Sequence, residues 1–220
     1  MNSDNNFDRI ILVDKPTGMS SFGAVARVRR QLTVEAGHKV KVGHCGTLDP
    51  FATGLLILVS GKITRKADEY MHQDKVYRAI IRLGETSTTG DPEGEITKQV
   101  VKHQPDQAEV ERALQRFTGE ITQTPPAYSA IKVNGQRAYK LARAGKDVEV
   151  PSRQVTVYWI KLLRYDYPEL EIECKVSSGT YIRTLAEDIG KALGTGAYTT
   201  ALRRLSIGKF KVDDAMAICQ

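Results

Sequence analysis

Short apolar or alternating segments occur along the whole chain and predict β-strands. The apolar runs at 10–16 (IILVDKP) and 55–59 (LLILV) have the length of buried strands. The segment 75–84 (KVYRAIIRLG) alternates instead, so its apolar side chains, Tyr77 among them, share one face and its arginines share the other. Further strands are expected at 128–133, 155–163, 170–176 and 205–212.

Apolar residues at helical spacing predict helices between these strands. The first helix follows Ser20, a residue suited to cap its N-terminus, and carries at helical spacing Phe22, Val25, Val28 and Leu32. Further helices are expected near 63–70, 110–117, 137–144 and 182–193, and at 213–216.

Turn signals separate several of these elements. Asp91-Pro92-Glu93-Gly94 has the chemistry of a tight turn, Asn134-Gly135 indicates a hairpin, and Gly145 suits a left-handed helix cap. Because strands and helices are interspersed without regular alternation, the pattern predicts an α+β fold with a mixed, mainly antiparallel sheet flanked by helices.

Composition narrows the class of protein. A chain of 220 residues with 41% hydrophobic and 26% charged residues can build one sizeable core. The longest apolar run is only strand-sized, and the polar start MNSDNNFDR is not a signal peptide. The three cysteines lie far apart and show no metal-binding or disulfide spacing. We therefore expect a cytoplasmic protein with reduced thiols, without a metal and away from membranes.

The chain is basic, with a net charge of +6. Its cations gather in clusters, which are Arg27-Arg29-Arg30, Lys39-Lys41, Lys62-Arg65-Lys66, Lys132-Arg137-Lys140-Arg143 and Arg203-Arg204-Lys209-Lys211. Charge alone leaves two interpretations open, a surface that binds a polyanion or ordinary solvated faces.

Common catalytic and cofactor motifs are absent from the sequence. No glycine pattern fits a phosphate loop or a dinucleotide site, and no Gly-x-Ser-x-Gly elbow occurs. The four histidines form no pair at metal-binding spacing. Hydrolase, dehydrogenase and nucleotidase functions therefore have no local support.

Two charged residues remain as candidates. Asp49 lies in GHCGTLDPFATG (43–54), where Asp-Pro alone is ordinary turn chemistry. Arg183 falls in the first turn of a predicted helix, where the helix dipole favours anions. Its ordinary explanation is a pair with Glu187 one turn later, although base before acid is the weaker order.

Six motifs, in order, carry a resemblance to a known family. They are LVDKPTGMSS with GHCGTLDPFATG, KVYRAIIRLGETSTTGDPEG, YSAIKVNGQRAYKLAR, SSGTYIRTLAEDIG and LRRLSIGKF. The chain thereby resembles the TruB family of tRNA pseudouridine synthases from about Ile10 to Val212. The resemblance implies the pseudouridine synthase fold with a thumb-like insertion at about 125–150. It also implies isomerisation of the uridine at position 55 in the tRNA T-loop, without a cofactor.

The resemblance assigns roles to individual residues. Asp49 would be the catalytic carboxylate, Arg183 its ionic partner and Tyr77 the ring that stacks on the flipped uracil. The other substrate-binding positions would be His44, Tyr181, Leu202 and Lys15, the last in a supporting role. The basic stretch 132–146 would close over the T-loop through phosphate contacts.

The same resemblance shapes the expected organisation. Many family members carry a C-terminal PUA domain, and residues 1–220 are expected to be a single catalytic domain without one. We expect a monomer whose partner is the T-arm of tRNA. Two alternatives stay open: an RNA-binding module that folds tRNA and catalyses only secondarily, and a guide-RNA-dependent pseudouridine synthase.

Overall fold

The computed structural model describes residues 7–129, 131–133, 135–145 and 150–218. Its chain divides into two compact units, residues 1–77 with 203–220 and residues 78–202. Two strands run from one unit into the other, β4 (Lys75–Leu83) and β12 (Ala197–Ile207).

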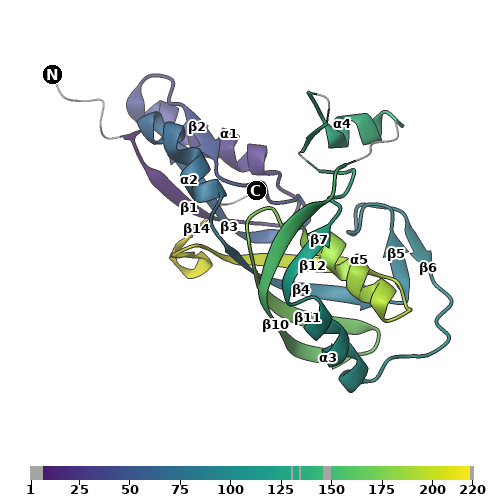
Figure 1. Cartoon of the computed structure of the whole chain (residues 1–220). Coiled ribbons are helices and arrows are strands. Elements are labelled where there is room, and N and C mark those ends of the chain that lie inside the picture. Colours follow the sequence, from purple (N-terminus) through teal and green to yellow (C-terminus); the bar gives the residue numbers. More distant parts are fainter. Residues whose placement is uncertain (1–6, 130, 134, 146–149, 219–220) are drawn as a thin grey trace. The chain divides into compact units, whose positions relative to one another are not determined.

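The first unit is built around strand β3 (Thr53–Ser60) (Figure 1). β3 pairs antiparallel with β1 (Ile10–Lys15) and with β2 (Val42–His44). β1 lies on one edge of β3, and β2 lies on the other edge together with the end of β12, which runs parallel to β3. The remaining elements are α1 (Ser21–Ala36), a 3-10 helix η2 (Gly61–Lys66), α2 (Ala67–Met71), β13 (Phe210–Lys211), a 3-10 helix η3 (Val212–Asp214) and β14 (Met216–Ala217).

β3 is buried on both faces, which explains its unbroken apolar run. Leu56 and Leu58 pack with Val25, Val28 and other apolar residues of α1. The alternate side chains of the strand pack on the opposite face with the end of β12 and with η2, and these are Leu55, Ile57 and Val59.

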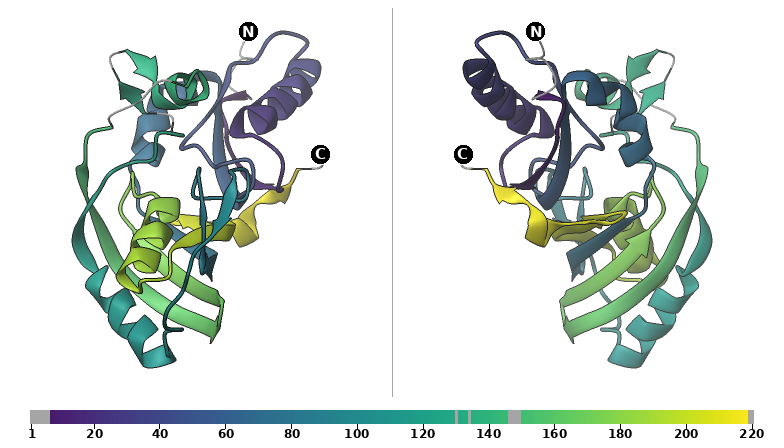
Figure 2. Two further views of the ribbon diagram at one scale, coloured as in Figure 1. Left: turned by 90° about the vertical axis from the view of Figure 1, so that its right-hand side faces the viewer. Right: turned by 90° about the vertical axis from the view of Figure 1, so that its left-hand side faces the viewer.

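The second unit carries a sheet in the order β12, β4, β11 (Glu169–Val176), β10 (Arg153–Asp166) and β7 (Gly119–Gln123). β10 and β11 form a long antiparallel hairpin (Figure 2). The other elements are the hairpin β5 (Glu85–Ser87) with β6 (Ile96–Lys98), α3 (Gln107–Arg116), the hairpin β8 (Lys132–Val133) with β9 (Gln136–Arg137), α4 (Ala138–Arg143) and α5 (Ile182–Ala192).

Most predicted elements are present in the structure. The Ser20 side chain accepts a hydrogen bond from the Gly23 N–H and so caps α1, as expected. Gly145 has a left-handed φ of 69°, and residues 91–94 form the predicted turn within the β5–β6 hairpin. Asn134 of the predicted Asn-Gly turn lies outside the described residues. The mixed, mainly antiparallel α+β prediction is confirmed.

Several boundaries were wrong. The strand expected at 205–212 begins earlier, at Ala197. The prediction missed this start because the first three residues of the strand are all buried and show no alternation of buried and exposed positions. The helix expected at 213–216 is a 3-10 turn followed by β14, which pairs in parallel with β1. Among the described residues of the strand expected at 128–133, Lys132–Val133 forms a strand and 128–129 and 131 do not. The exposed Phe22 does not join the buried face of α1, since 67% of its surface is accessible.

Arg204 is a buried cation that joins β12 to the chain before β3. Its side chain is 1% exposed, and its Nε donates to the Leu55 carbonyl at 2.7 Å. Nη1 and Nη2 donate to the carbonyls of Thr47 and Gly46, each at 3.3 Å. Gly54 is required beside it, because its φ is 102° and a Cβ there would collide with the Arg204 backbone.

We predict that Arg204→Lys lowers the free energy of unfolding by about 2–4 kcal/mol. Lysine retains the charge, but its single ammonium group cannot donate to all three carbonyls that the planar guanidinium of Arg204 reaches. Urea denaturation measures the change. The matched control is Arg203→Lys, whose side chain is 39% exposed and pairs with Asp14. The control should cost at most about 1 kcal/mol, and equal losses in the two variants would contradict the anchoring role of Arg204.

Lys75 is a second buried cation in the first unit. Its Nζ donates to the carbonyls of Met71 and Gln73. Burial first, and then the charge of Arg204, lower the pKa of Lys75 from its ordinary 10.5 to about 8. Between these values the unfolded chain holds a proton that the folded chain has released, so stability rises with pH.

Replacing Lys75 by methionine should remove this rise. We expect the unfolding free energy of the wild type, relative to Lys75→Met, to increase by about 1 kcal/mol between pH 8 and pH 9. Denaturant titrations of both proteins at these two pH values provide the measurement. A difference between them that does not change with pH would show that the Lys75 pKa is ordinary.

Candidate active site

Asp49 lies on the loop 45–52, which joins β2 to β3. The Ser21 Oγ accepts from the Leu48 N–H and donates to the Leu48 carbonyl, both at 2.9 Å. The Pro50 carbonyl accepts from the Gly18 N–H at 2.8 Å. The chain is therefore held on both sides of Asp49 by the segment that precedes and starts α1.

Lys15 supports the same loop from β1. It is fully buried, and its Nζ donates to the carbonyls of Pro16 at 2.9 Å, Met19 at 2.7 Å and Pro50 at 3.2 Å. A charged donor strengthens each of these bonds. Lys15 thus fixes the turn after β1 against the residue that follows Asp49.

Tyr77 reaches the loop through Arg204. The Tyr77 side chain is 8% exposed, and its hydroxyl lies 3.5 Å from Arg204 Nη1. The same guanidinium nitrogen bonds the Thr47 carbonyl. Tyr77 and the Asp49 loop are therefore oriented by one side chain, which the sequence analysis did not select.

A signal for Arg204 was nevertheless present in the sequence. Two neighbouring residues of a strand point to opposite faces, so the pair Arg203-Arg204 must send one cation to each side of β12. Arg203 faces Asp14 and solvent, whereas Arg204 faces the core.

His44 ends β2 at the entrance of the loop. Its ring packs edge-on against Phe22, with centroids 5.2 Å apart and an angle of 85° between the planes. Cys45, the next residue, is fully buried, and burial with the nearby charge of Asp68 raises its pKa to about 11. The raised pKa keeps this thiol protonated at neutral pH, and a protonated thiol is a poor nucleophile.

Arg183 belongs to the second unit and occupies the first turn of α5. It is 3% exposed, and its Nη1 pairs with the Asp91 carboxylate at 2.9 Å. It also donates to the carbonyls of Thr89 at 2.7 Å and Tyr128 at 3.0 Å. The ion pair at 2.9 Å thus goes to an acid of the β5–β6 turn, whereas Glu187, the ordinary partner considered from sequence, interacts with Arg183 through its charge. The predicted pair of Arg183 with Asp49 joins residues of different units and stays a prediction.

Tyr181 and Leu202 also belong to the second unit. Tyr181 caps α5, and the Gln123 side-chain amide exchanges hydrogen bonds with its backbone N–H and carbonyl at 3.0 and 3.1 Å. The Arg153 guanidinium lies over its ring, 5.2 Å from the centroid. Leu202 is 7% exposed in β12. No pattern in the sequence pointed to Gln123, which orients Tyr181.

Two kinds of feature are absent from the described residues, a metal-binding cluster and a membrane-spanning helix. In this part of the chain no group of three or more His, Cys, Asp or Glu side chains could hold a metal ion. No helix within it is long and apolar enough to cross a membrane.

Two family models match the chain. Residues 29–182 match the TruB family pseudouridylate synthase N-terminal domain, and residues 183–219 match the tRNA pseudouridylate synthase B C-terminal domain. Together they cover most of the sequence.

Curated relatives with the name tRNA pseudouridine synthase B agree with these models. The protein of Burkholderia lata is 46% identical over 96% of this chain and 64% of its own length. The protein of Chromohalobacter salexigens is 47% identical over 94% of this chain and 66% of its own length. The protein of Phocaeicola vulgatus is 42% identical over 95% of this chain and 89% of its own length. The chain thus spans about two thirds of the first two relatives.

Solved structures agree in fold, and each of the following two covers nearly the whole chain. The Cbf5-Nop10-Gar1 complex matches with a TM-score of 0.73 and 30% identity, over 95% of this chain and 52% of the matched one. An H/ACA RNP bound to a substrate RNA containing 2'-deoxyuridine matches with a TM-score of 0.69 and 28% identity, over 94% of this chain and 50% of the matched one. The chain therefore belongs to the TruB family of pseudouridylate synthases.

Proposed function

We propose that this protein isomerises uridine to pseudouridine at position 55 in the T-loop of tRNA, with Asp49 as the catalytic carboxylate. The observation that carries the proposal is the fixed backbone around Asp49. Ser21 holds the residue before it, and Lys15 and Gly18 hold the residue after it. The names of the curated relatives supply the substrate, tRNA.

The chemistry fits a single positioned carboxylate. The reaction breaks the C–N bond between ribose and uracil, turns the base and forms a C–C bond to the same ribose. No atom is gained or lost, so neither water nor a redox cofactor takes part. A carboxylate can act as nucleophile or as base in such a step, and its effect depends on accurate placement.

The flipped uracil needs a surface to replace its lost stacking. Extrusion costs a few kcal/mol, and stacking on an aromatic ring returns roughly 1–3 kcal/mol per base. We assign this stacking to Tyr77, whose orientation Arg204 maintains through the hydroxyl. His44 would contact the nucleotide, Tyr181 and Leu202 would line the base pocket, and Lys15 would support the Asp49 loop.

Arg183 is assigned as the ionic partner of Asp49. A guanidinium offers five N–H donors, so its bond to Asp91 is compatible with a second carboxylate. The pair would keep Asp49 ionised and oriented.

The proposed organisation follows the same assignment. The chain would act in the cytoplasm as a monomer, without a cofactor, and would bind the T-arm of tRNA. The insertion at about 125–150, which contains β8, β9 and α4, would be the thumb. Residues 146–149 of this insertion lie outside the described residues.

A guide-RNA-dependent synthase is the alternative with a specific observation behind it. Two of the matched structures are a Cbf5 complex and an H/ACA RNP with substrate RNA. The identity of 46–47% with tRNA pseudouridine synthase B proteins, against 28–30% with these structures, favours action without a guide.

Asp49→Asn should reduce pseudouridine formation at least about 10³-fold, because the amide is neither nucleophile nor base at neutral pH. The substrate is a T-arm hairpin without guide or partner protein, and nucleoside analysis of the digested RNA quantifies the product. An unchanged circular dichroism spectrum and unchanged RNA binding confirm that only chemistry was lost.

The outcomes separate the alternatives. Full product formation by Asp49→Asn would refute the catalytic assignment. Wild-type protein that acts only with a guide RNA would favour the guide-dependent alternative. Restored tRNA maturation by the inactive variant would favour the RNA-folding alternative.

A further inference from the structure

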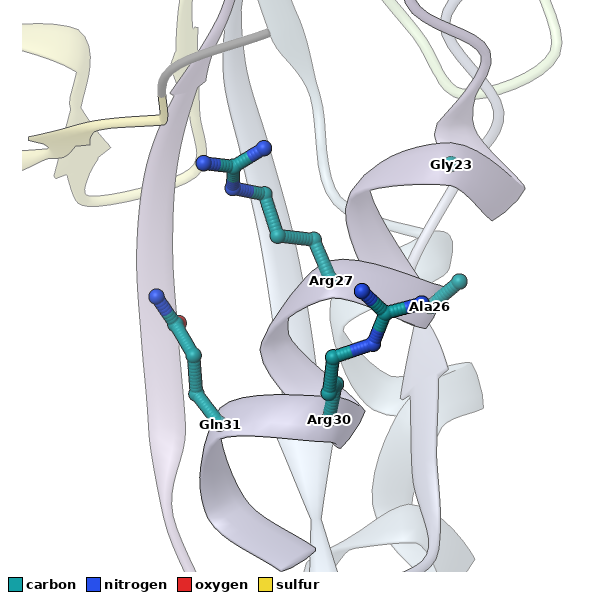
Figure 3. A pocket seen from close by; sticks show the side chains of 5 residues that line it. All are labelled: Gly23, Ala26, Arg27, Arg30 and Gln31. Atoms are coloured by element: carbon teal, nitrogen blue, oxygen red, sulfur yellow. The ribbon is translucent and has the colours of Figure 1, made fainter. Parts of the chain in front are cut away.

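The solvent-facing side of α1 carries a groove bordered by two arginines. Gly23, Ala26, Arg27, Arg30 and Gln31 line it, all from the same helix (Figure 3). Figure 3 shows the Arg30 guanidinium beside Ala26, while Arg27 and Gln31 extend from the neighbouring row of the helix. The small side chain of Ala26 leaves room for a ligand to approach the helix between the two cations.

The positive charge of this groove is not balanced locally. α1 contains three arginines and a single acid, Glu35, which pairs with Arg9 at 2.9 Å. Within the described part of the chain, Arg27 and Arg30 form no ion pair with a carboxylate, and both are exposed. Planar guanidinium groups of this kind suit phosphate oxygens, which they bind in a bidentate manner.

An aromatic ring continues the groove toward the Asp49 loop. Phe22 lies one helical turn before Ala26 and two before Arg30, so the three share one row of the helix. An exposed phenyl group alone is common on protein surfaces. Phe22, however, packs against His44, and the two nearly perpendicular rings present a joint aromatic surface.

The spacing suits a nucleic-acid strand. Eight residues of helix separate Phe22 from Arg30, which is about 12 Å along the axis. That distance corresponds to roughly three or four base steps at 3.4 Å each. An aromatic platform followed by cations is the arrangement with which proteins bind single-stranded nucleic acid.

We propose that the outer face of α1, defined by Phe22, Ala26, Arg27 and Arg30, binds the RNA strand that adjoins the nucleotide contacted by His44. Phe22 stacks on a base, and Arg27 and Arg30 bind phosphates farther along the strand. The placement of the strand rests on the proposed function, since it takes His44 as a substrate contact. The cationic groove and its exposed ring do not depend on that assignment.

The double variant Arg27→Gln with Arg30→Gln tests the phosphate contacts. The double variant is made in the Asp49→Asn protein, so that the RNA is not modified during the measurement. Its binding to a fluorescently labelled T-arm hairpin is measured by anisotropy titration. We expect affinity to fall about tenfold at 0.1 M salt, and the slope of log K against log salt to become shallower by about 1–2.

The matched control removes the same charge elsewhere. Arg65→Gln with Lys66→Gln changes two exposed cations at the end of η2. Its loss of affinity and change of slope should be clearly smaller. Equal changes in the two double variants would show that the effect comes from overall charge and would overturn the proposal. An unchanged salt slope in the α1 variant would overturn it as well.

Substitutions of Phe22 test the stacking contact. Phe22→Leu keeps an apolar side chain without a ring and should weaken binding about fivefold or more, whereas Phe22→Trp should bind at least as well as the wild type. If Phe22 had only a structural role, Phe22→Trp would not bind RNA better than Phe22→Leu, because the larger indole disturbs packing more than leucine does. Equal affinities for leucine and tryptophan would contradict stacking.

The α1 surface and the proposed function are tested by separate measurements, so either can be refuted without the other. Pseudouridine formation by the wild type tests the proposed function, while anisotropy with the Asp49→Asn protein tests the α1 surface. Loss of binding in the α1 variants together with an inactive wild type would preserve the surface and refute the proposed function. Unchanged binding together with an active wild type would refute the surface alone.

Discussion

The first unit depends on how one buried guanidinium is solvated. Removing a cation from water costs several kcal/mol unless protein groups replace its hydration. For Arg204 these groups include the carbonyls of Gly46, Thr47 and Leu55. None of them can move away without leaving the charge less well bonded, so the loop before β3 has a single low-energy position. The close approach of Arg204 also requires glycine at position 54, because the Arg204 backbone occupies the space that a side chain there would need.

A second cation constrains the loop from the opposite end. Lys15 bonds Pro50 from β1, while Ser21 bonds both polar groups of the Leu48 backbone. Because these contacts go to main-chain atoms, they fix the path of the loop and leave the Asp49 side chain to be defined by its own environment. The backbone that carries this carboxylate is already ordered, so placing the carboxylate costs little further backbone conformational entropy. The rigidity is a property of the buried polar contacts, since loops without them are mobile.

Elements with a clear period could be predicted from the sequence, and elements defined by distant partners could not. β11 and α5 show their periods directly, because one face of each is buried. β14 is only two residues long and exists because the edge of β1 offers hydrogen bonds. In the site, Asp49 was selected because its motif resembles that of a known family, since Asp-Pro alone is ordinary turn chemistry. Arg204 was missed because its partners lie about 150 residues earlier in the chain.

The environment of Arg183 shows how a cation in an unfavourable local position is compensated by residues distant in the sequence. A cation in the first turn of a helix opposes the helix dipole, and Glu187 offered a simple compensation. The structure compensates it with Asp91, 92 residues away, and with the carbonyls of Thr89 and Tyr128. One buried guanidinium thereby ties the start of α5 to the β5–β6 turn and to the chain that enters the β8–β9 hairpin. Since removal of either partner of a buried pair leaves an uncompensated charge, these three segments are positioned together.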